Sequence, residues 1–398
     1  MAAPFPINVF VSAAQLFATQ LNAMVTALNT LNPSGKGSIF GSSTAGTPAE
    51  LLPSSGGVLV SDSSTTSGLN WLSLMSAGKN KIINGDFGIW QRGISFTTAG
   101  AYTADRFIYN VDGGTFTVSQ RTFTPGSAPV SGYESQYYLE VAAATGGNAQ
   151  YLIQRIEDVR VFASQTVTLS YWAKANTPVT ATPLASQVFG SGGSSNVITT
   201  FPSVSIGTSW QRVTSTFAIP TINTKTVGTG SYLEVQFLRF STAATIDIWG
   251  VQLEAGSVAT AFQTATGTVQ GELALCQRYY FRNANGASTG VFAGGGVAFS
   301  TTAGIVPVVM PVPMRITPTT LDTTGTAANY RLYNGSINSA LNAVPTISAG
   351  DSTQNLVMLN VAVVAGLLAG SNFQLSANTS TGAYLGFKFR RKELVDFF

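Results

Sequence analysis

The side chains in this sequence that could do chemistry are carboxylates and aromatic rings, because histidine is absent and cysteine occurs once. Without imidazole the chain lacks the usual general base and the usual transition-metal ligand, so zinc enzymes and Ser-His-Asp hydrolases are excluded. Cys276 lies among apolar neighbours in LALCQRYY, with no residue nearby that would stabilise a thiolate. We therefore expect a buried, inert thiol and no cofactor.

Paired carboxylates would be the remaining route to hydrolysis, since glycoside cleavage needs two of them about 5 to 10 Å apart across a cleft. The spacing of Glu140, Glu157 and Asp158 picks out no such pair, so we predict that the chain is not an enzyme. Asp105 and Arg106 would face opposite ways on a strand and could not pair with each other. A buried arginine paired across the sheet is favoured there over a ligand contact.

Carbohydrate binding uses flat aromatic rings, which stack on the C–H faces of sugars, together with polar side chains that hold hydroxyl groups; most aromatic residues of this chain also fit a packing role. Tyr133, Tyr137 and Tyr138 in SGYESQYY, and Trp210 after a turn in GTSWQR, are the candidate glycan-binding residues. A packing role is expected for three other tryptophans: Trp90, Trp172 and Trp249.

Charge is scarce, at 9% of residues, and the formal net charge is only +3. No basic stripe exists, so nucleic-acid binding is not expected. The local excess KFRRK, at Lys388 to Lys392, is interpreted as a solvated strand end or an intersubunit contact rather than a polyanion site. A weakly charged surface suits a particle component that buries much of its area against other subunits.

The N-terminal 35 residues carry no charge and contain a heptad pattern of apolar residues, which predicts a helix. We interpret residues 1–35 as a trimeric bundle or an anchor docked in a hydrophobic socket. The alternative is an amphipathic helix that covers its own domain. The anchor residues are Phe10, Phe17, Leu21, Met24, Leu28 and Leu31.

The rest of the chain predicts a mainly β protein. Residues 36–78 are a Gly-, Ser- and Thr-rich segment that is either ordered by partner chains or a linker. Residues 79–267 alternate with period two in short runs, as in a jelly-roll β-sandwich. A helix at 268–282 would link this domain to a second, C-terminal β-sandwich domain at 283–398.

Two strand-like runs carry specific expectations. TVTLSYWAKA places Val167, Leu169, Tyr171 and Ala173 on one face. In IVPVVMPVPM, the prolines restrict the run to an edge strand or a bulged one: Pro307, Pro311 and Pro313.

Four ordered motifs resemble the receptor-binding modules at the distal end of bacteriophage tail fibres and head spikes. They are NGDFGIWQRG from Asn84, YTADRF from Tyr102, GVQLEAGSVATAF from Gly250 and LALCQRYY from Leu273. Upstream, LLPSSGGVLVSDSSTTSGLNW resembles shaft repeats that interleave between three chains. The resemblance implies a jelly roll, a homotrimer and attachment to a host surface. The C-terminal FRRKELVDFF departs from the acidic ending that is usual in this family.

NGDF also resembles the first strand of carbohydrate-binding modules, and this resemblance implies a calcium site formed by Asp86 and Asp247. Gly88 stands where those modules usually have a glutamate, so one oxygen ligand is missing. The alternative is that Asp86 caps a turn and Asp247 bonds to nearby backbone.

Together these patterns predict a homotrimeric phage fibre protein that attaches to a host bacterial surface polysaccharide without cleaving it. Its partners would be itself, other virion proteins through the N-terminal helix, and a host glycan. The alternative is a structural head-fibre, collar or decoration protein that binds only virion proteins. A depolymerising tailspike would show a long β-helix, which the sequence does not suggest. We expect assembly in the host cytoplasm, no signal peptide and no membrane span.

Overall fold

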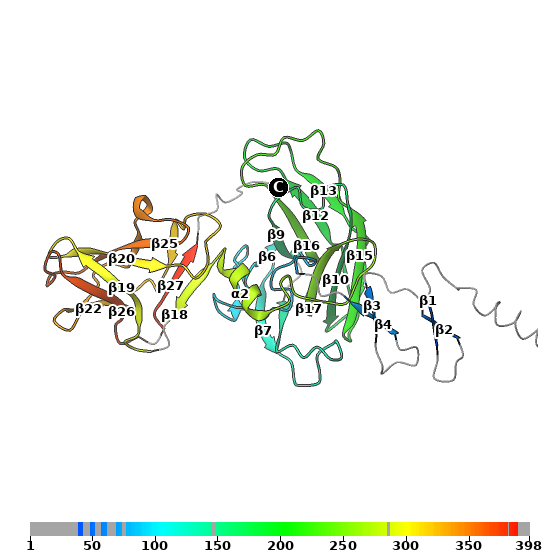
Figure 1. Ribbon diagram of the computed structural model, residues 1–398, viewed down its shortest axis with the longest axis horizontal. Coiled ribbons are helices and arrows are strands. Elements are labelled where there is room, and N and C mark those ends of the chain that lie inside the picture. Colours follow the sequence, from blue (N-terminus) through cyan, green and yellow to red (C-terminus); the bar gives the residue numbers. More distant parts are fainter. Residues whose placement is uncertain are drawn as a thin grey trace, which may run out of the picture. The chain divides into compact units, whose positions relative to one another are not determined.

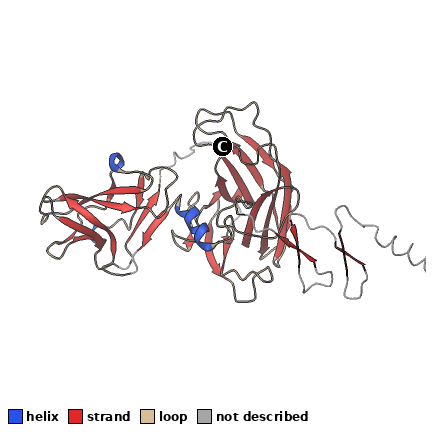
Figure 2. Ribbon diagram, viewed as in Figure 1, coloured by secondary structure: helices blue, strands red, loops and turns tan. Residues whose placement is uncertain are grey.

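The computed structural model describes residues 39–42, 48–51, 57–61, 69–73, 77–144, 149–284, 287–380 and 382–388. They belong to two compact units, Met1–Met75 and Ser76–Phe398, which are described separately. The described part is mainly β-sheet, as predicted (Figures 1 and 2). None of its helices is long and apolar enough to cross a membrane. The residues of the expected N-terminal helix lie outside the described part: Phe10, Phe17, Leu21, Met24, Leu28 and Leu31.

In the first unit, the predicted shaft segment contains two antiparallel strand pairs. Strand β1 (Ile39–Ser42) pairs with β2 (Pro48–Leu51), and β3 (Gly57–Ser61) pairs with β4 (Leu69–Ser73). The last two strands fall on the apolar pieces GVLVS and LNWLS of the sequence.

In the second unit, residues up to Ala255 form two facing antiparallel sheets, here called the first sandwich (Figure 1). The six-stranded sheet has the order β15 (Gln211–Ala218), β10 (Thr166–Ala175), β17 (Ala244–Ala255), β8 (Tyr137–Ala143), β7 (Phe116–Thr122) and β5 (Ser95–Phe96). The five-stranded sheet has the order β13 (Val197–Thr200), β12 (Leu184–Val188), β16 (Tyr232–Phe240), β9 (Ala149–Ile156) and β6 (Phe107–Asp112). A small pair adjoins them, β11 (Val179–Ala181) with β14 (Val204–Ile206).

Successive strands alternate between the two large sheets: β8 lies in the first, β9 in the second, β10 in the first and β12 in the second. Such alternation is the arrangement of a jelly roll. Both inner faces contribute to one apolar core, which includes the predicted face of β10. The residues of that face are all buried: Val167, Leu169, Tyr171 and Ala173.

A single turn-and-helix segment follows the first sandwich. Helix α2 (Val269–Gln277) begins at the N-cap Thr268, whose hydroxyl accepts a hydrogen bond from the Gly271 amide. It ends earlier than the segment 268–282 that the sequence suggested, because residues from Phe281 onward form a strand. Cys276 is buried in this helix, and burial raises the pKa of its thiol, in keeping with an inert residue.

A second sandwich follows, with its own apolar core. Its larger sheet has the order β23 (Asn338–Ala340), β22 (Tyr330–Tyr333), β26 (Asn372–Ala377), β19 (Val291–Ala298), β20 (Ala303–Val309), β25 (Leu356–Ala362) and β24 (Thr346–Ile347). The smaller sheet has the order β18 (Phe281–Ala284), β27 (Tyr384–Lys388) and β21 (Thr320–Asp322). Two 3-10 turns lie in the connections, Ala327–Asn329 and Ala349–Asp351.

The proline-containing strand is not at an edge, contrary to the expectation from sequence. Strand β20 lies between β19 and β25, but it pairs with β19 only near Ile305, before Pro307 is reached. Pro307 is paired with Met358 of β25 but has no partner residue on the β19 side of the strand, where its missing N–H is therefore tolerated. Pro311 and Pro313 lie beyond the end of the strand at Val309.

The expectation that Asp105 and Arg106 lie on a strand was also wrong. They occupy a turn that precedes β6, where the Phe107 amide donates to the Ala104 carbonyl and Arg106 has a φ of 75°. A turn leaves both side chains free to point toward the same region of the molecule.

Candidate glycan-binding face

The six-stranded sheet of the first sandwich has an outer face, turned away from the core, that carries polar and aromatic side chains. Because side chains alternate along a strand, the residues between the core residues of β10 lie on this face. They include Trp172 and Lys174. On β17, Asp247 and Trp249 take the same side, while Ile246 and Ile248 point into the core.

A row of polar side chains crosses four neighbouring strands of this face. Glu140 of β8 is paired with Ser119 of β7 on one side and with Asp247 of β17 on the other. Asp247 is paired in turn with Lys174 of β10, and its Oδ2 lies 3.1 Å from Lys174 Nζ. At the other end, Arg121 Nη2 lies 2.6 Å from Glu140 Oε1. We call these five residues the polar row.

Asp247 is the most enclosed carboxylate of the row, with a side chain that is 11% exposed. Its burial raises its pKa, and the neighbouring ammonium of Lys174 acts in the opposite direction. Oδ1 of Asp247 has no hydrogen-bond partner among the described residues, and neither has Nε1 of Trp249, two positions along the same strand. Both atoms belong to side chains of the outer face.

Aromatic rings lie next to the polar row. Trp172 is the cross-strand partner of Trp249, and their ring centroids are 5.4 Å apart. Tyr138 meets Trp210 edge to face at 5.7 Å, and Lys174 Nζ lies 5.4 Å from the Trp210 ring centroid. The full set, here called the aromatic cluster, is Phe123, Tyr133, Tyr138, Trp172, Trp210, Trp249 and Phe262.

A bulge at Gly250 makes this arrangement possible. Before the bulge the even-numbered Ile248 points into the core, and after it the odd-numbered Val251 does. The inward-facing positions of β17 therefore shift by one residue at Gly250. Gly250 has a φ of +67°, and a Cβ placed there would lie 2.8 Å from Cε3 of Trp172. The ring of Trp172 therefore rests directly on the glycine backbone.

The connection from β7 to β8, residues 123–136, folds back over part of the cluster. Its Tyr133 ring lies 5.3 Å from Trp249 and 5.6 Å from Phe262, and burial raises the pKa of the Tyr133 hydroxyl. Val130 of the same loop packs against the cluster as well. Trp249 and Phe262 are thus covered, whereas Tyr138 and Trp210 remain partly exposed.

Of the glycan-binding residues expected from sequence, the structure brings three together and separates one. Tyr133, Tyr138 and Trp210 all belong to the aromatic cluster. Tyr137 is next to Tyr138 on β8, so alternation places it on the opposite side, with Leu139. Two tryptophans with an expected packing role, Trp172 and Trp249, do pack, but against the outer face rather than in the main core.

The calcium candidates lie in different surroundings. For Asp247, burial and Glu140 raise the pKa of the carboxyl group, and Lys174 lowers it. For Asp86, burial and the nearby Glu272 raise the pKa to about 6. Asp86 Oδ1 accepts a long hydrogen bond from the Gly88 amide at 3.4 Å, as in a capped turn. Within the described ranges, no group of three His, Cys, Asp or Glu side chains is arranged to hold a metal ion.

The other carboxylates considered for hydrolysis are engaged by arginines. Glu157 forms ion pairs with Arg315 and with Arg278, and Asp158 lies 2.6 Å from Arg160. Glu140 belongs to the polar row.

The polar row as a unit was not predicted from sequence. Alternation along TVTLSYWAKA and TIDIWGVQ would have placed Lys174 with Trp172, and Asp247 with Trp249, on shared faces. The pairing of Asp247 with Lys174 and Glu140 depends on strand register across large sequence separations, for which no local signal exists.

No protein-family model matches the sequence, and no curated protein matches it. Among solved structures, a CBM22-1 xylan-binding domain from Paenibacillus barcinonensis is 13% identical, with 47% of this chain and 100% of that chain covered and a TM-score of 0.29. The enzymatically active domain of tailspike protein 4 from bacteriophage CBA120 is 18% identical, with 45% and 22% covered and a TM-score of 0.28. A cyclase from Fischerella sp. TAU is 16% identical, with 46% and 100% covered and a TM-score of 0.32. Likenesses this weak do not support an argument about function.

Proposed function

We propose that this chain is a homotrimeric fibre protein of a bacteriophage that attaches the virion to a polysaccharide of the host surface. The outer face of the first sandwich is the binding surface, and binding involves no cleavage. The observation that carries the proposal is the juxtaposition of the partly exposed rings of Tyr138 and Trp210 with the polar row.

The chemistry of this face suits a neutral glycan. Tyr138 and Trp210 offer ring surfaces to the C–H faces of sugars. In the polar row, Arg121 and Lys174 balance Glu140 and Asp247, so the face has donors and acceptors for hydroxyl groups without an excess of either charge.

Single sites of this kind bind sugars weakly, and multivalency makes them effective. The predicted trimer and the array of fibres on a virion would raise the effective concentration of each further site. The anchor pattern at residues 1–35 and the shaft at 36–78 fit this role.

Attachment is tested with the full chain on bacterial cells and on an array of neutral capsular and O-antigen polysaccharides. We expect the double variant Tyr138→Ala and Trp210→Ala to lose about tenfold or more in retention, because two stacking surfaces are removed and multivalency amplifies the loss. Tyr333→Ala, at an exposed tyrosine of the second sandwich, is the matched control and should bind as the parent chain does. A trimer that ignores every cell and polysaccharide would overturn the proposal.

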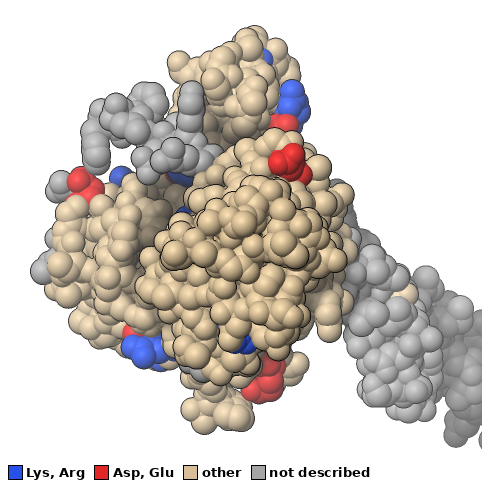
Figure 3. Space-filling view, turned by 90° about the vertical axis from the view of Figure 1, so that its left-hand side faces the viewer, with Lys and Arg blue, Asp and Glu red and all other residues tan. Residues whose placement is uncertain are grey.

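A structural role on the virion is the second candidate function, and one surface favours it. In the second sandwich, hydrogen bonds from Val363 to Thr302 and from Leu367 to Thr301 hold a loop beside the β19–β20 turn. The two segments expose Phe299, Val364 and Leu368, which are 60%, 79% and 72% exposed. Figure 3 shows few charged side chains on the face that it presents. Exposed apolar side chains on a charge-poor surface suit contact with another protein.

A further inference from the structure

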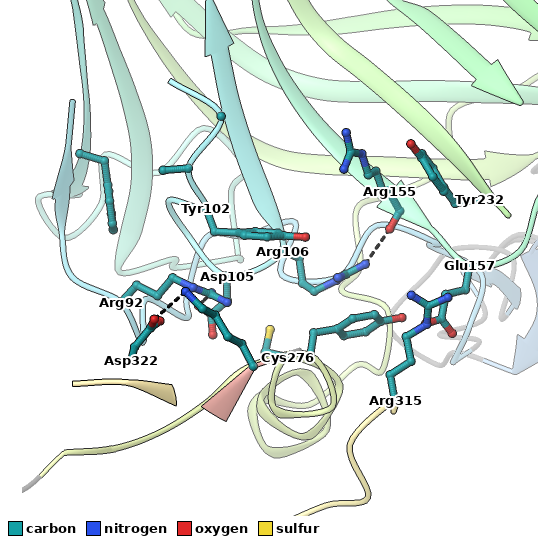
Figure 4. A pocket seen from close by; sticks show the side chains of 15 residues that line it. Arg92, Tyr102, Asp105, Arg106, Arg155, Glu157, Tyr232, Cys276, Arg315 and Asp322 are labelled. Atoms are coloured by element: carbon teal, nitrogen blue, oxygen red, sulfur yellow. Dashed lines mark hydrogen bonds and ion pairs between the residues drawn. The ribbon is translucent and has the colours of Figure 1, made fainter. Parts of the chain in front are cut away.

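A separate cavity of about 390 Å³ lies between the first sandwich, helix α2 and the smaller sheet of the second sandwich (Figure 4). Its size falls within the range of about 300 to 1,000 Å³ that is usual for small-molecule sites. Its lining includes Asp105 and Arg106 from the turn before β6, Arg155 from the end of β9, Cys276 of α2 and Tyr279 just after α2. It is distinct from the outer face, since it contains no residue of the polar row or the aromatic cluster.

The lining carries more positive than negative charge. Its three carboxylates are each engaged by a cation of the same lining: Asp105 by Arg92 at 3.0 Å, Glu157 by Arg315, and Asp322 by Lys388 at 2.5 Å. These pairs leave two further arginines in the lining, Arg106 and Arg155.

Arg155 is neutralised from outside the cavity, but Arg106 is not. Nε of Arg155 lies 2.7 Å from Oε2 of Glu234. Arg106 forms no ion pair with any described residue, and the nearby Asp105 is already bonded to Arg92 and Gln91. Arg106 is therefore the cation of this cavity that lacks a dedicated counter-charge.

Arg106 is buried and fixed in place. It is 6% exposed, its Nη2 donates to the Arg155 carbonyl at 2.6 Å, and its guanidinium carbon lies 3.4 Å from the Tyr279 ring centroid. Its Nε has no hydrogen-bond partner among the described residues. Figure 4 shows the side chain in the middle of the cavity, between Arg92 at one end and Arg315 at the other. A buried guanidinium with an unused donor is costly unless an anion completes it.

We propose that this cavity binds the carboxylate of an acidic sugar. The planar guanidinium of Arg106 is the group that best matches a carboxylate, and its stacking on Tyr279 holds it in one orientation. Phe96, Tyr102 and Tyr232 supply ring surfaces for the sugar body. Lys388, with a side chain that is 40% exposed, pairs with Asp322 and keeps that carboxylate from repelling an incoming anion. The chain would then have two sites of different chemistry, one for a neutral glycan and one for a sugar acid.

Glucuronate is the probe, titrated calorimetrically into the full chain, with glucose as the uncharged match and inorganic phosphate as the plain anion. We expect saturable binding of glucuronate, at least about tenfold weaker binding of glucose and phosphate, and weaker binding of glucuronate as salt is raised. Methyl glucuronoside, which resembles a residue inside a polymer, should bind as well as free glucuronate if the source is a polysaccharide, and more weakly if it is a free sugar acid. Either order supports the proposal.

Arg106→Gln should weaken glucuronate binding about tenfold or more, while Arg160→Gln, at an exposed arginine outside the lining, should leave it unchanged. If Arg106→Gln does not fold, Lys388→Gln in the lining carries the test, with an expected loss of about threefold. Absence of glucuronate binding to the parent chain, or phosphate binding as tight as glucuronate, would overturn the proposal. Attachment to neutral polysaccharide, measured on the same Arg106→Gln protein, should persist, so the two proposals can fail separately.

Discussion

The role that a residue can have in this chain depends on its position in the fold and on its neighbours, as well as on its type. Tyr137 and Tyr138 are chemically identical neighbours, yet alternation along β8 sends one to the side of Leu139 and the other to the aromatic cluster. Asp86 and Asp247 were paired by resemblance, but each has a different electrostatic environment. Residue identity could be read from sequence, whereas these environments required the tertiary structure.

Asp86 provides a pH-dependent test at this scale. Burial, with a smaller contribution from Glu272, raises its pKa from 3.8 to about 6. Between these two pH values the folded state holds a proton that the unfolded state releases, so stability decreases as pH rises through this window. Asp86→Asn should remove this cost and raise the free energy of unfolding at pH 7.5 by about 3 kcal/mol.

Urea unfolding at pH 4.5 and 7.5 measures the effect. The gap between parent and Asp86→Asn should be small at the lower pH and wide at the higher one. Asp351→Asn, at an exposed carboxylate of the second sandwich, is the control for the general effect of replacing a carboxylate by an amide. Parallel pH profiles for the parent and Asp86→Asn would contradict the assignment.

At the scale of elements, the strands themselves could be predicted because the apolar alternation is strong. TVTLSYWAKA became β10 with Val167 and Leu169 in the core, and in QRVTSTFA the buried Val213 and Phe217 alternate with exposed threonines. Register could not be predicted, because the partner of Lys174 lies at Asp247, far along the chain. The position of the proline-containing strand β20 was predicted wrongly. Its pairing with β19 ends before Pro307, and nothing in the sequence of β20 indicates where that pairing ends.

The bulge in β17 gives the test at this scale. Gly250→Ala adds a Cβ that would lie 2.8 Å from Trp172 in a backbone with a φ of +67°. We expect a loss of about 3 kcal/mol in the free energy of unfolding, from backbone strain together with overpacking.

Gly230→Ala is the matched control, since Gly230 has a φ of +75° but no atom within 4 Å of an added Cβ. It should cost only about 1 kcal/mol. The near-ultraviolet circular dichroism of the tryptophans should change in Gly250→Ala alone. Equal costs for the two variants would show that the contact with Trp172 does not matter.

For the whole molecule, the proposal depends on assembly, and the anchor pattern at residues 1–35 makes that testable. Leu21→Asp with Leu28→Asp places two charges in the apolar seam of the predicted helix, so we expect a trimer to become a monomer in sedimentation velocity. Thr19→Asp with Thr26→Asp adds the same charge outside the seam and should leave the trimer intact. A parent chain that sediments as a monomer would remove the multivalent part of the proposal.

The loop between β7 and β8 has a consequence for how such a protein could change its target. Tyr133 and Val130 anchor the loop on the aromatic cluster, while Thr124, Pro125 and Ser127 in the turn directly after β7 are exposed and contribute nothing to either core. Insertions or replacements in this turn would reshape the border of the outer face without disturbing a single strand. Under the proposed function, host range would then drift through a few solvent-facing positions, and grafting there would redirect the fibre.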